Sequence, residues 1–157
     1  MEFVVKHDDG LSGDGLAEAD IVLIGVSRTG KTPLSMYLGY LGCKTANIPL
    51  VRGIQPPAAL FRIDRARIVG LTIDPQRLAQ IRGRRLRAIG GGGGRDGYAE
   101  LNRIYEELEE AAAVQRRLGC PVLDVTTMAV EEAAGRVIDL IDERAGRTYD
   151  PAPGPRG

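Results

Sequence analysis

Four residues near the start of the chain have the types and the spacing of a phosphate-binding loop. Gly25, Gly30, Lys31 and Thr32 satisfy the pattern G-x-x-x-x-G-K-[ST]. In such a loop the backbone N–H groups surround the phosphates, the lysine amine reaches the terminal phosphates, and the hydroxyl holds Mg²⁺. We therefore expect a nucleotide to bind the whole loop, with Lys31 catalytic and Thr32 a metal ligand. The loop consists of Gly25, Val26, Ser27, Arg28, Thr29, Gly30, Lys31 and Thr32.

A phosphate loop works only between a strand and a helix, and the flanking residues predict both. The apolar, β-branched run 21–24 precedes the loop as a strand. After the loop, leucines recur at helical spacing and predict a helix from Pro33 to about Leu41. The positive N-terminal end of that helix would face the same anion. The alternative, a glycine turn with a surface lysine, does not account for this setting.

Asp74 is a second candidate, because it ends the apolar run that begins at Arg67 and precedes Pro75. Many phosphate-loop enzymes place at such a strand end the carboxylate that orients Mg²⁺ through water. An Asp-Pro pair is also a typical helix N-terminus, with Asp as the cap and Pro at the first helical position. We expect both a cap and a catalytic or metal role for Asp74.

The helix predicted over 75–88 is rich in arginine, which a phosphoryl-transfer site needs to neutralise charge. A nucleic-acid surface is the competing interpretation. It is disfavoured because Lys+Arg and Asp+Glu number 21 each, aromatic residues make up 4% and Trp is absent. We expect Arg82 and Arg85 to contact phosphate and the other arginines of this helix to be solvated.

The only histidine of the chain, His7, is followed by Asp8 and Asp9. One of these carboxylates could act as a general base, with the neighbouring groups orienting it or contacting a metal. An Asp-rich turn with a solvated histidine fits the same residues. The residues by themselves leave both interpretations open.

The remaining pattern alternates strands with helices. Strands are predicted over 43–47, 67–75 and 121–125, a long amphipathic helix over 98–118, and a last helix around Val130 to Ile141. The face of the long helix with Glu106, Glu107, Glu109 and Glu110 indicates a solvated surface. This alternation predicts an α/β fold, a P-loop three-layer sandwich with a largely parallel sheet flanked by helices. We expect an N-terminal segment over 1–19, a phosphotransferase domain over 20–146 and a Pro/Gly-rich tail over 147–157.

Composition limits the classes of partner. No apolar run is long enough to span a bilayer and no secretory segment is recognisable. Cys43 and Cys120 have neither metal-ligand nor redox spacing, which favours reduced, buried thiols. We expect a cytoplasmic protein that binds neither nucleic acid nor membrane, with homo-oligomerisation left open.

Five segments, in order, together resemble the pyruvate, phosphate dikinase regulatory protein family, whose sister group regulates phosphoenolpyruvate synthase. The segments are 6–10, 19–35, 46–51, 70–75 and 119–126, and the likeness extends to about Arg144. Members of that family are about twice as long and contain the Lys6–Gly10 segment in mid-chain. The resemblance therefore implies that this chain corresponds to the C-terminal half, with 1–19 continuing from an N-terminal half.

The resemblance implies a bifunctional serine/threonine kinase and pyrophosphorylase. Such proteins use ADP and Mg²⁺ to phosphorylate a threonine of the dikinase beside its phosphorylated catalytic histidine, and use inorganic phosphate to reverse this with release of pyrophosphate. It implies catalytic roles for His7, Asp8 and Asp9, with either carboxylate as base. Ser27–Thr29 and Pro33–Ser35 favour the dikinase branch. The alternatives are a regulator of phosphoenolpyruvate synthase, a small-molecule P-loop kinase and a non-catalytic nucleotide-binding half-protein.

Overall fold

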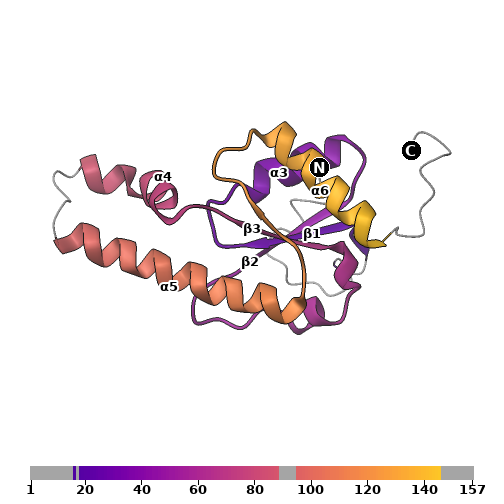
Figure 1. The fold of residues 1–157 in the computed structure, drawn as a ribbon, viewed down its shortest axis with the longest axis horizontal. Helices are drawn as coiled ribbons and strands as arrows, with labels where there is room; N and C mark the ends of the chain where they lie inside the picture. The colour runs from indigo at the N-terminus through magenta and orange to yellow at the C-terminus, as the bar shows by residue number, and fades with distance from the viewer. Residues whose placement is uncertain (1–15, 17, 89–94, 146–157) are drawn as a thin grey trace.

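A computed structural model describes residues 16, 18–88 and 95–145 of the chain (Figure 1). Strands and helices alternate along the described residues, as the sequence predicts. The elements in order are β1 (Ile21–Gly25), α3 (Lys31–Tyr40), β2 (Thr45–Pro49), the 3-10 turns η1 (Ala58–Phe61) and η2 (Arg65–Arg67), β3 (Ile68–Thr72), α4 (Pro75–Ala88), α5 (Arg95–Leu118), β4 (Val122–Asp124) and α6 (Val130–Ala145).

The four strands form one parallel sheet in the order β2-β1-β3-β4. In this register Leu23 of β1 lies beside Asn47 of β2 on one side and Val69 of β3 on the other. All five residues of β1 are buried, because a central strand of a parallel sheet has both faces covered. The strand that precedes the phosphate-loop motif is thus one of the two inner strands of the sheet, beside β3.

Residues on alternate sides of β1 pack into two different cores. Val22 and Ile24 belong to the core that contains Ile104 and Leu118 of α5. Ile21 and Leu23 belong to the core that contains residues of α3 and α6. Helices therefore cover both faces of the sheet, with α3 and α6 on one face and α5 on the other (Figure 1). The predicted three-layer α/β architecture is confirmed.

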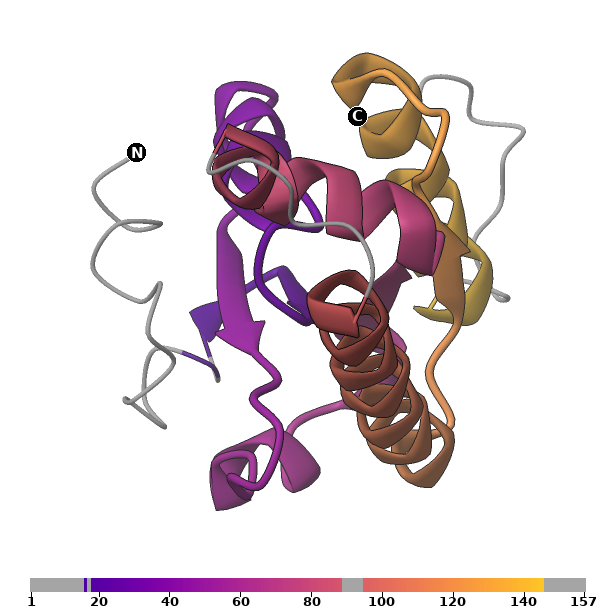
Figure 2. The same ribbon diagram turned by 90° about the vertical axis from the view of Figure 1, so that its left-hand side faces the viewer.

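Helices α4 and α5 lie side by side and extend beyond the sheet as a helical hairpin, on the side where β3 ends (Figures 1 and 2). The hairpin leaves the sheet directly after Thr72, so the first turns of α4 stand beside the loop that follows β1. This placement brings Arg82 of α4 to the phosphate loop, and Glu107 of α5 to Arg82.

Most predicted elements are present, with shifted ends. Helix α4 has the predicted bounds, whereas β2 begins two residues later than predicted, at Thr45. The reason is local: α3 ends in a turn in which Gly42 has φ +100° and the Cys43 N–H donates to the Leu38 carbonyl at 2.9 Å. The residues predicted to start the strand are needed to end the helix.

Among the described residues, no helix combines the length and the apolar character needed to span a bilayer.

Candidate functional site

The loop after β1 and the connection after β3 meet at the carboxyl edge of the sheet. From β1 the chain passes to β2 on one side, and then returns to β3 on the other side of β1. Parallel sheets bind ligands in the crevice that such a reversal leaves between strand ends. The phosphate-loop motif and Asp74 therefore lie at the edge where a ligand is expected.

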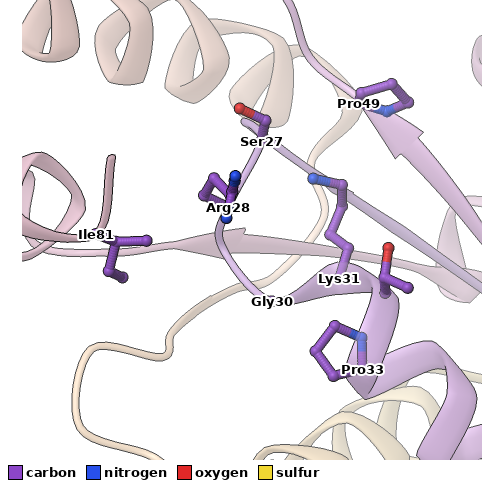
Figure 3. A pocket seen from close by; sticks show the side chains of 8 residues that line it. Ser27, Arg28, Gly30, Lys31, Pro33, Pro49 and Ile81 are labelled. Carbon is purple, nitrogen blue, oxygen red and sulfur yellow. The ribbon is translucent and has the colours of Figure 1, made fainter. Parts of the chain in front are cut away.

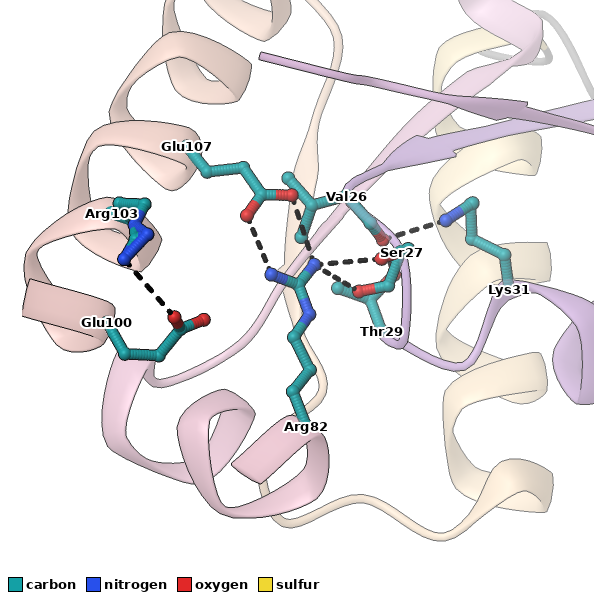
Figure 4. Close-up of polar contacts among 8 residues, drawn as sticks. All are labelled: Val26, Ser27, Thr29, Lys31, Arg82, Glu100, Arg103 and Glu107. Atoms are coloured by element: carbon teal, nitrogen blue, oxygen red, sulfur yellow. Dashed lines mark hydrogen bonds and ion pairs between the residues drawn. The ribbon is translucent and has the colours of Figure 1, made fainter. Parts of the chain in front are cut away.

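The phosphate loop has a strained, closed backbone. Arg28 has φ +70° and Gly30 has φ +91°, both in the left-handed region. Glycine adopts this conformation without steric cost, whereas a residue with a Cβ loses roughly 1–2 kcal/mol. The Thr29 hydroxyl donates to the Val26 carbonyl at 2.9 Å and closes the loop (Figure 4). Backbone strain of this kind is concentrated at ligand-binding loops.

Lys31 is the first residue of α3, and its side chain turns back over the loop. Its Nζ donates to the Val26 carbonyl at 2.8 Å, and the residue is only 8% exposed (Figure 4). Burying an ammonium group is costly unless polar groups satisfy it. A carbonyl partner inside the loop holds the positive charge at the helix N-terminus, where an anion is favoured.

A buried polar chain connects β2 to the first turn of α3. The Asn47 amide donates to the Ser35 hydroxyl at 3.0 Å, and Ser35 Oγ donates to the Thr32 carbonyl at 3.0 Å. Asn47 and Ser35 are both fully buried. Because Asn47 Nδ2 and Ser35 Oγ both have partners inside the protein, these two hydrogen bonds tie Thr32, at the end of the loop, to β2.

A cleft of about 440 Å³ opens over the loop (Figure 3). We call it the phosphate cleft. Its lining consists of Ser27, Arg28, Gly30, Lys31, Thr32, Pro33, Pro49 and Ile81. Five of the predicted nucleotide-binding residues line it, and Lys31 and Thr32 are among them. The geometry can accommodate an anion between the lysine, the loop amides and the start of α3.

Arg82 of α4 lies on the phosphate loop and is bound to α5 as well. Its Nη2 donates to the Ser27 carbonyl at 2.8 Å and to the Ser27 hydroxyl at 2.9 Å. The same guanidinium pairs with Glu107, whose Oε1 lies 2.7 Å from Nη1 (Figure 4). Arg82 is thus at the predicted site, while its contact with phosphate stays a prediction.

Several other predicted site residues lie outside the part of the chain that the structure describes. These are His7, Asp8, Asp9 and the side chain of Arg85. Their catalytic and phosphate-contact roles stay predictions.

Asp74 caps α4, as the sequence predicts. Its Oδ2 accepts from the Arg77 N–H at 3.0 Å, and its own N–H donates to the Thr126 hydroxyl at 2.8 Å. Thr126 Oγ in turn donates to Asp124 at the end of β4. The connections after β3 and β4 are therefore joined through one threonine, and the metal role of Asp74 stays a prediction.

No three His, Cys, Asp or Glu side chains within residues 16, 18–88 and 95–145 form a metal site by themselves. Mg²⁺ in nucleotide sites is held by one or two protein ligands together with substrate phosphates. The Thr32 hydroxyl lines the phosphate cleft and fits that kind of site. It would be one protein ligand, and the phosphates of the nucleotide would complete the coordination of Mg²⁺.

The prediction of a solvated glutamate face on the long helix is wrong for one of its residues. Glu107 is held by Arg82, and its side chain is 19% exposed. Glu106, Glu109 and Glu110 are exposed, as predicted, and Glu110 Oε2 also accepts the Gly53 N–H at 2.7 Å. The partners of Glu107 and Glu110 are far away in sequence, so the helical pattern alone gave no signal for these contacts.

Both cysteines are free thiols and partly buried. Burial raises the pKa of the Cys43 thiol, and the charges of Asp20 and Asp142 raise it further. Burial also raises the pKa of Cys120, against the opposing effect of backbone hydrogen bonds. A raised pKa keeps a thiol protonated and unreactive, so neither cysteine has the character of a nucleophile.

The chain is similar to known proteins over most of its length. A model of the kinase/pyrophosphorylase family matches residues 1–138. Three similar relatives are named "Putative pyruvate, phosphate dikinase regulatory protein". The protein of Cutibacterium acnes is 64% identical over 92% of this chain and 49% of its own length. That of Desulfitobacterium hafniense is 52% identical over 90% of this chain and 51% of its own length. That of Alkaliphilus metalliredigens is 50% identical over 92% of this chain and 52% of its own length.

The chain spans about half the length of the curated relatives that it matches. The family match covers the described loop, the sheet and most of α6. On this evidence the chain belongs to the kinase/pyrophosphorylase family.

Proposed function

We propose that this chain is the nucleotide-binding part of a bifunctional serine/threonine kinase and pyrophosphorylase that regulates pyruvate, phosphate dikinase. Family membership supports a phosphotransferase, and the names of the relatives support the dikinase as the target. The observation that carries the proposal is the position of Lys31 at the start of α3: the residue is only 8% exposed, and its amine is held at 2.8 Å from the Val26 carbonyl of the loop.

In the forward direction a threonine hydroxyl of the dikinase attacks the β-phosphorus of ADP. The bond between that phosphorus and the bridging oxygen breaks, AMP leaves, and the hydroxyl proton passes to a base, for which Asp8 or Asp9 is the candidate. The loop amides and Lys31 would stabilise the charge that spreads over the transferring phosphoryl group.

In the reverse direction an oxygen of inorganic phosphate attacks the phosphorus of phosphothreonine. The threonine oxygen leaves with a proton, and pyrophosphate is released. The same loop would hold the attacking phosphate, because both directions place two linked phosphates over the Lys31 amine.

Mg²⁺ would supply further charge neutralisation between the phosphates when it is bound. The residues that would hold it are Thr32, directly, and Asp74, through water. The carboxylate of Asp74 keeps its capping bond to Arg77 in this arrangement, so its second oxygen is the one available for such a role.

Nucleotide binding is tested by thermal unfolding of the chain with ADP, ATP and AMP, each with Mg²⁺. We expect ADP to stabilise the folded chain, by about 2.7 kcal/mol at a concentration one hundred times its Kd. Lys31→Ala removes this stabilisation. Lys44→Ala, at an exposed lysine outside the phosphate cleft, is the matched control and keeps it. Full stabilisation of Lys31→Ala by ADP would overturn the nucleotide site.

Transfer is tested with purified dikinase that carries a phosphorylated catalytic histidine and with ADP labelled in its β-phosphate. We expect label on a threonine of the dikinase and one AMP per phosphate transferred. Adding phosphate should release the label as pyrophosphate. ADP binding without transfer would restrict the chain to the nucleotide-binding role, and label transfer from ATP alone would contradict the ADP-dependent reaction.

A further inference from the structure

A second cleft, of about 260 Å³, lies against the other side of the phosphate loop. It shares Arg28, Gly30, Pro33 and Ile81 with the phosphate cleft. The two clefts therefore meet at the Arg28–Gly30 segment of the loop, which we call the crest of the loop; Figure 3 shows this segment beside Ile81. One ligand that extends across this segment can occupy both clefts.

The far wall of the second cleft comes from the connections that follow β3 and β4 and from the first turn of α6. It presents aliphatic and thioether groups from Ile73, Val125, Met128, Val130 and Ala133. We call this cavity the Met128 cleft. It contains neither Lys31 nor Thr32, which line only the phosphate cleft. The groups expected to bind a phosphate thus line one cleft, and the aliphatic side chains line the other.

Hydrogen bonds hold that wall in place. The Val125 N–H donates to the Thr72 carbonyl at 2.9 Å, and the Met128 N–H donates to the Val125 carbonyl at 3.1 Å. Thr126, which also lines the cleft, joins Asp74 to Asp124. A wall fixed before the ligand arrives loses little conformational entropy on binding.

The chemistry of the Met128 cleft suits a flat, weakly polar ring system. Aliphatic and thioether groups pack against such a ring, and a guanidinium can stack on its face. Arg28 and Arg77 both line the cleft and can supply that group. The ring must be attached to a diphosphate, because the crest of the loop leads directly to Lys31.

We propose that the Met128 cleft binds the nucleobase of the nucleoside diphosphate whose phosphates occupy the phosphate cleft. This assignment rests on the proposed function and adds the position of the base to it. It predicts that the nucleoside contributes binding energy through the β3–α4 and β4–α6 connections. It also leaves the side of the phosphate cleft that is lined by Pro49 for the phosphoryl acceptor.

The test compares ADP with inorganic pyrophosphate, which carries the same linked phosphates without a nucleoside. Calorimetric titration of the whole chain, with Mg²⁺, gives both affinities. Val130→Phe fills the Met128 cleft, and Val122→Phe, on the exposed edge of β4 and outside both clefts, is the matched control. We expect Val130→Phe to weaken ADP about tenfold and to leave pyrophosphate unchanged. We expect Val122→Phe to change neither.

Met128→Ala is the second variant, because it opens the wall without adding volume and keeps the test decisive if Val130→Phe does not fold. It should also weaken ADP and spare pyrophosphate. An unchanged ratio of ADP to pyrophosphate affinity in the folded variants would overturn the position of the base. Pyrophosphate binding that Lys31→Ala removes would still support the proposed function in that case. Failure of both ligands to bind the unmodified chain would overturn the two proposals together.

Discussion

The guanidinium of Arg82 forms a two-point ion pair with Glu107, at 2.7 Å from Nη1 to Oε1 and 3.0 Å from Nη2 to Oε2. The pair joins the two helices of the hairpin, and Arg82 also donates to Ser27 of the phosphate loop. Both side chains are about one-fifth exposed, at 20% and 19%. The conformation of the loop is therefore coupled to the position of the α4–α5 hairpin (Figure 4).

Glu107→Gln should lower the free energy of unfolding by about 1–2 kcal/mol, because a partly buried guanidinium loses its charged partner. Glu106→Gln is the matched control, since Glu106, with a side chain 59% exposed, pairs with Arg52, whose side chain is 51% exposed. Such an exposed pair contributes at most about 1 kcal/mol. Urea unfolding measures the free energy of unfolding of both variants. Equal decreases would show that the Arg82–Glu107 pair stabilises the protein no more than an exposed pair does.

Arg82→Gln should weaken ADP about tenfold, through the loss of a positive charge beside the phosphate cleft. Glu107→Gln should not weaken ADP, because it leaves the guanidinium at the loop. Arg52→Gln, which lies outside the phosphate cleft, serves as control for the general effect of removing an arginine. Equal ADP affinities of Arg82→Gln and the unmodified chain would contradict a phosphate contact by Arg82.

Asp74→Asn separates the cap from the metal role. Asparagine caps a helix as well as aspartate does, so stability should change by only a few tenths of a kcal/mol, whereas Asp74→Ala should lose about 1 kcal/mol. If Asp74 orients Mg²⁺, Asp74→Asn weakens ADP in the presence of Mg²⁺ and leaves the Mg²⁺-free affinity unchanged. The control is Asp64→Asn, where the carboxylate accepts the Ala66 N–H at 2.9 Å in the connection before β3. A loss of stability without a loss of Mg²⁺ dependence would leave Asp74 as a cap only.

Local signals allowed most of the fold to be predicted, and tertiary contacts limited the rest. Helix α4 has its predicted bounds because an Asp-Pro cap is encoded in adjacent residues. Glu107 was predicted to be solvated because its partner lies 25 residues away on another helix. The contact between Asn47 and Ser35 was missed for the same reason, since nothing in an isolated strand shows what its buried amide will meet. Long-range polar pairs depend on how the elements pack, and periodicity carries no information on that packing.

The two cysteines give the stability a distinct pH dependence. Burial raises the pKa of Cys43 and Cys120 above the ordinary value of 9.0, so the unfolded chain releases these protons first as the pH rises. Stability that is present below pH 9 is then lost as the pH rises through the folded-state pKa values. Replacing both cysteines with alanine should make this decline shallower as the pH rises above 9.0. Parallel curves for the two proteins in urea unfolding would contradict a contribution from the thiols.

Gly30→Ala should damage the site more than the fold. Gly30 and Gly42 have similar backbone conformations, with φ +91° and φ +100°, and a Cβ at either position would meet no atom within 4 Å. Alanine at each should therefore lose a similar amount of stability, roughly 1–2 kcal/mol, from left-handed strain alone. Only Gly30 lies in the phosphate cleft, so only Gly30→Ala should weaken pyrophosphate and ADP, because relief of the strain moves the loop amides. Titration of both variants beside their urea unfolding curves makes the comparison. Equal affinities at equal stability would show that the left-handed turn at Gly30 has no part in holding the phosphates.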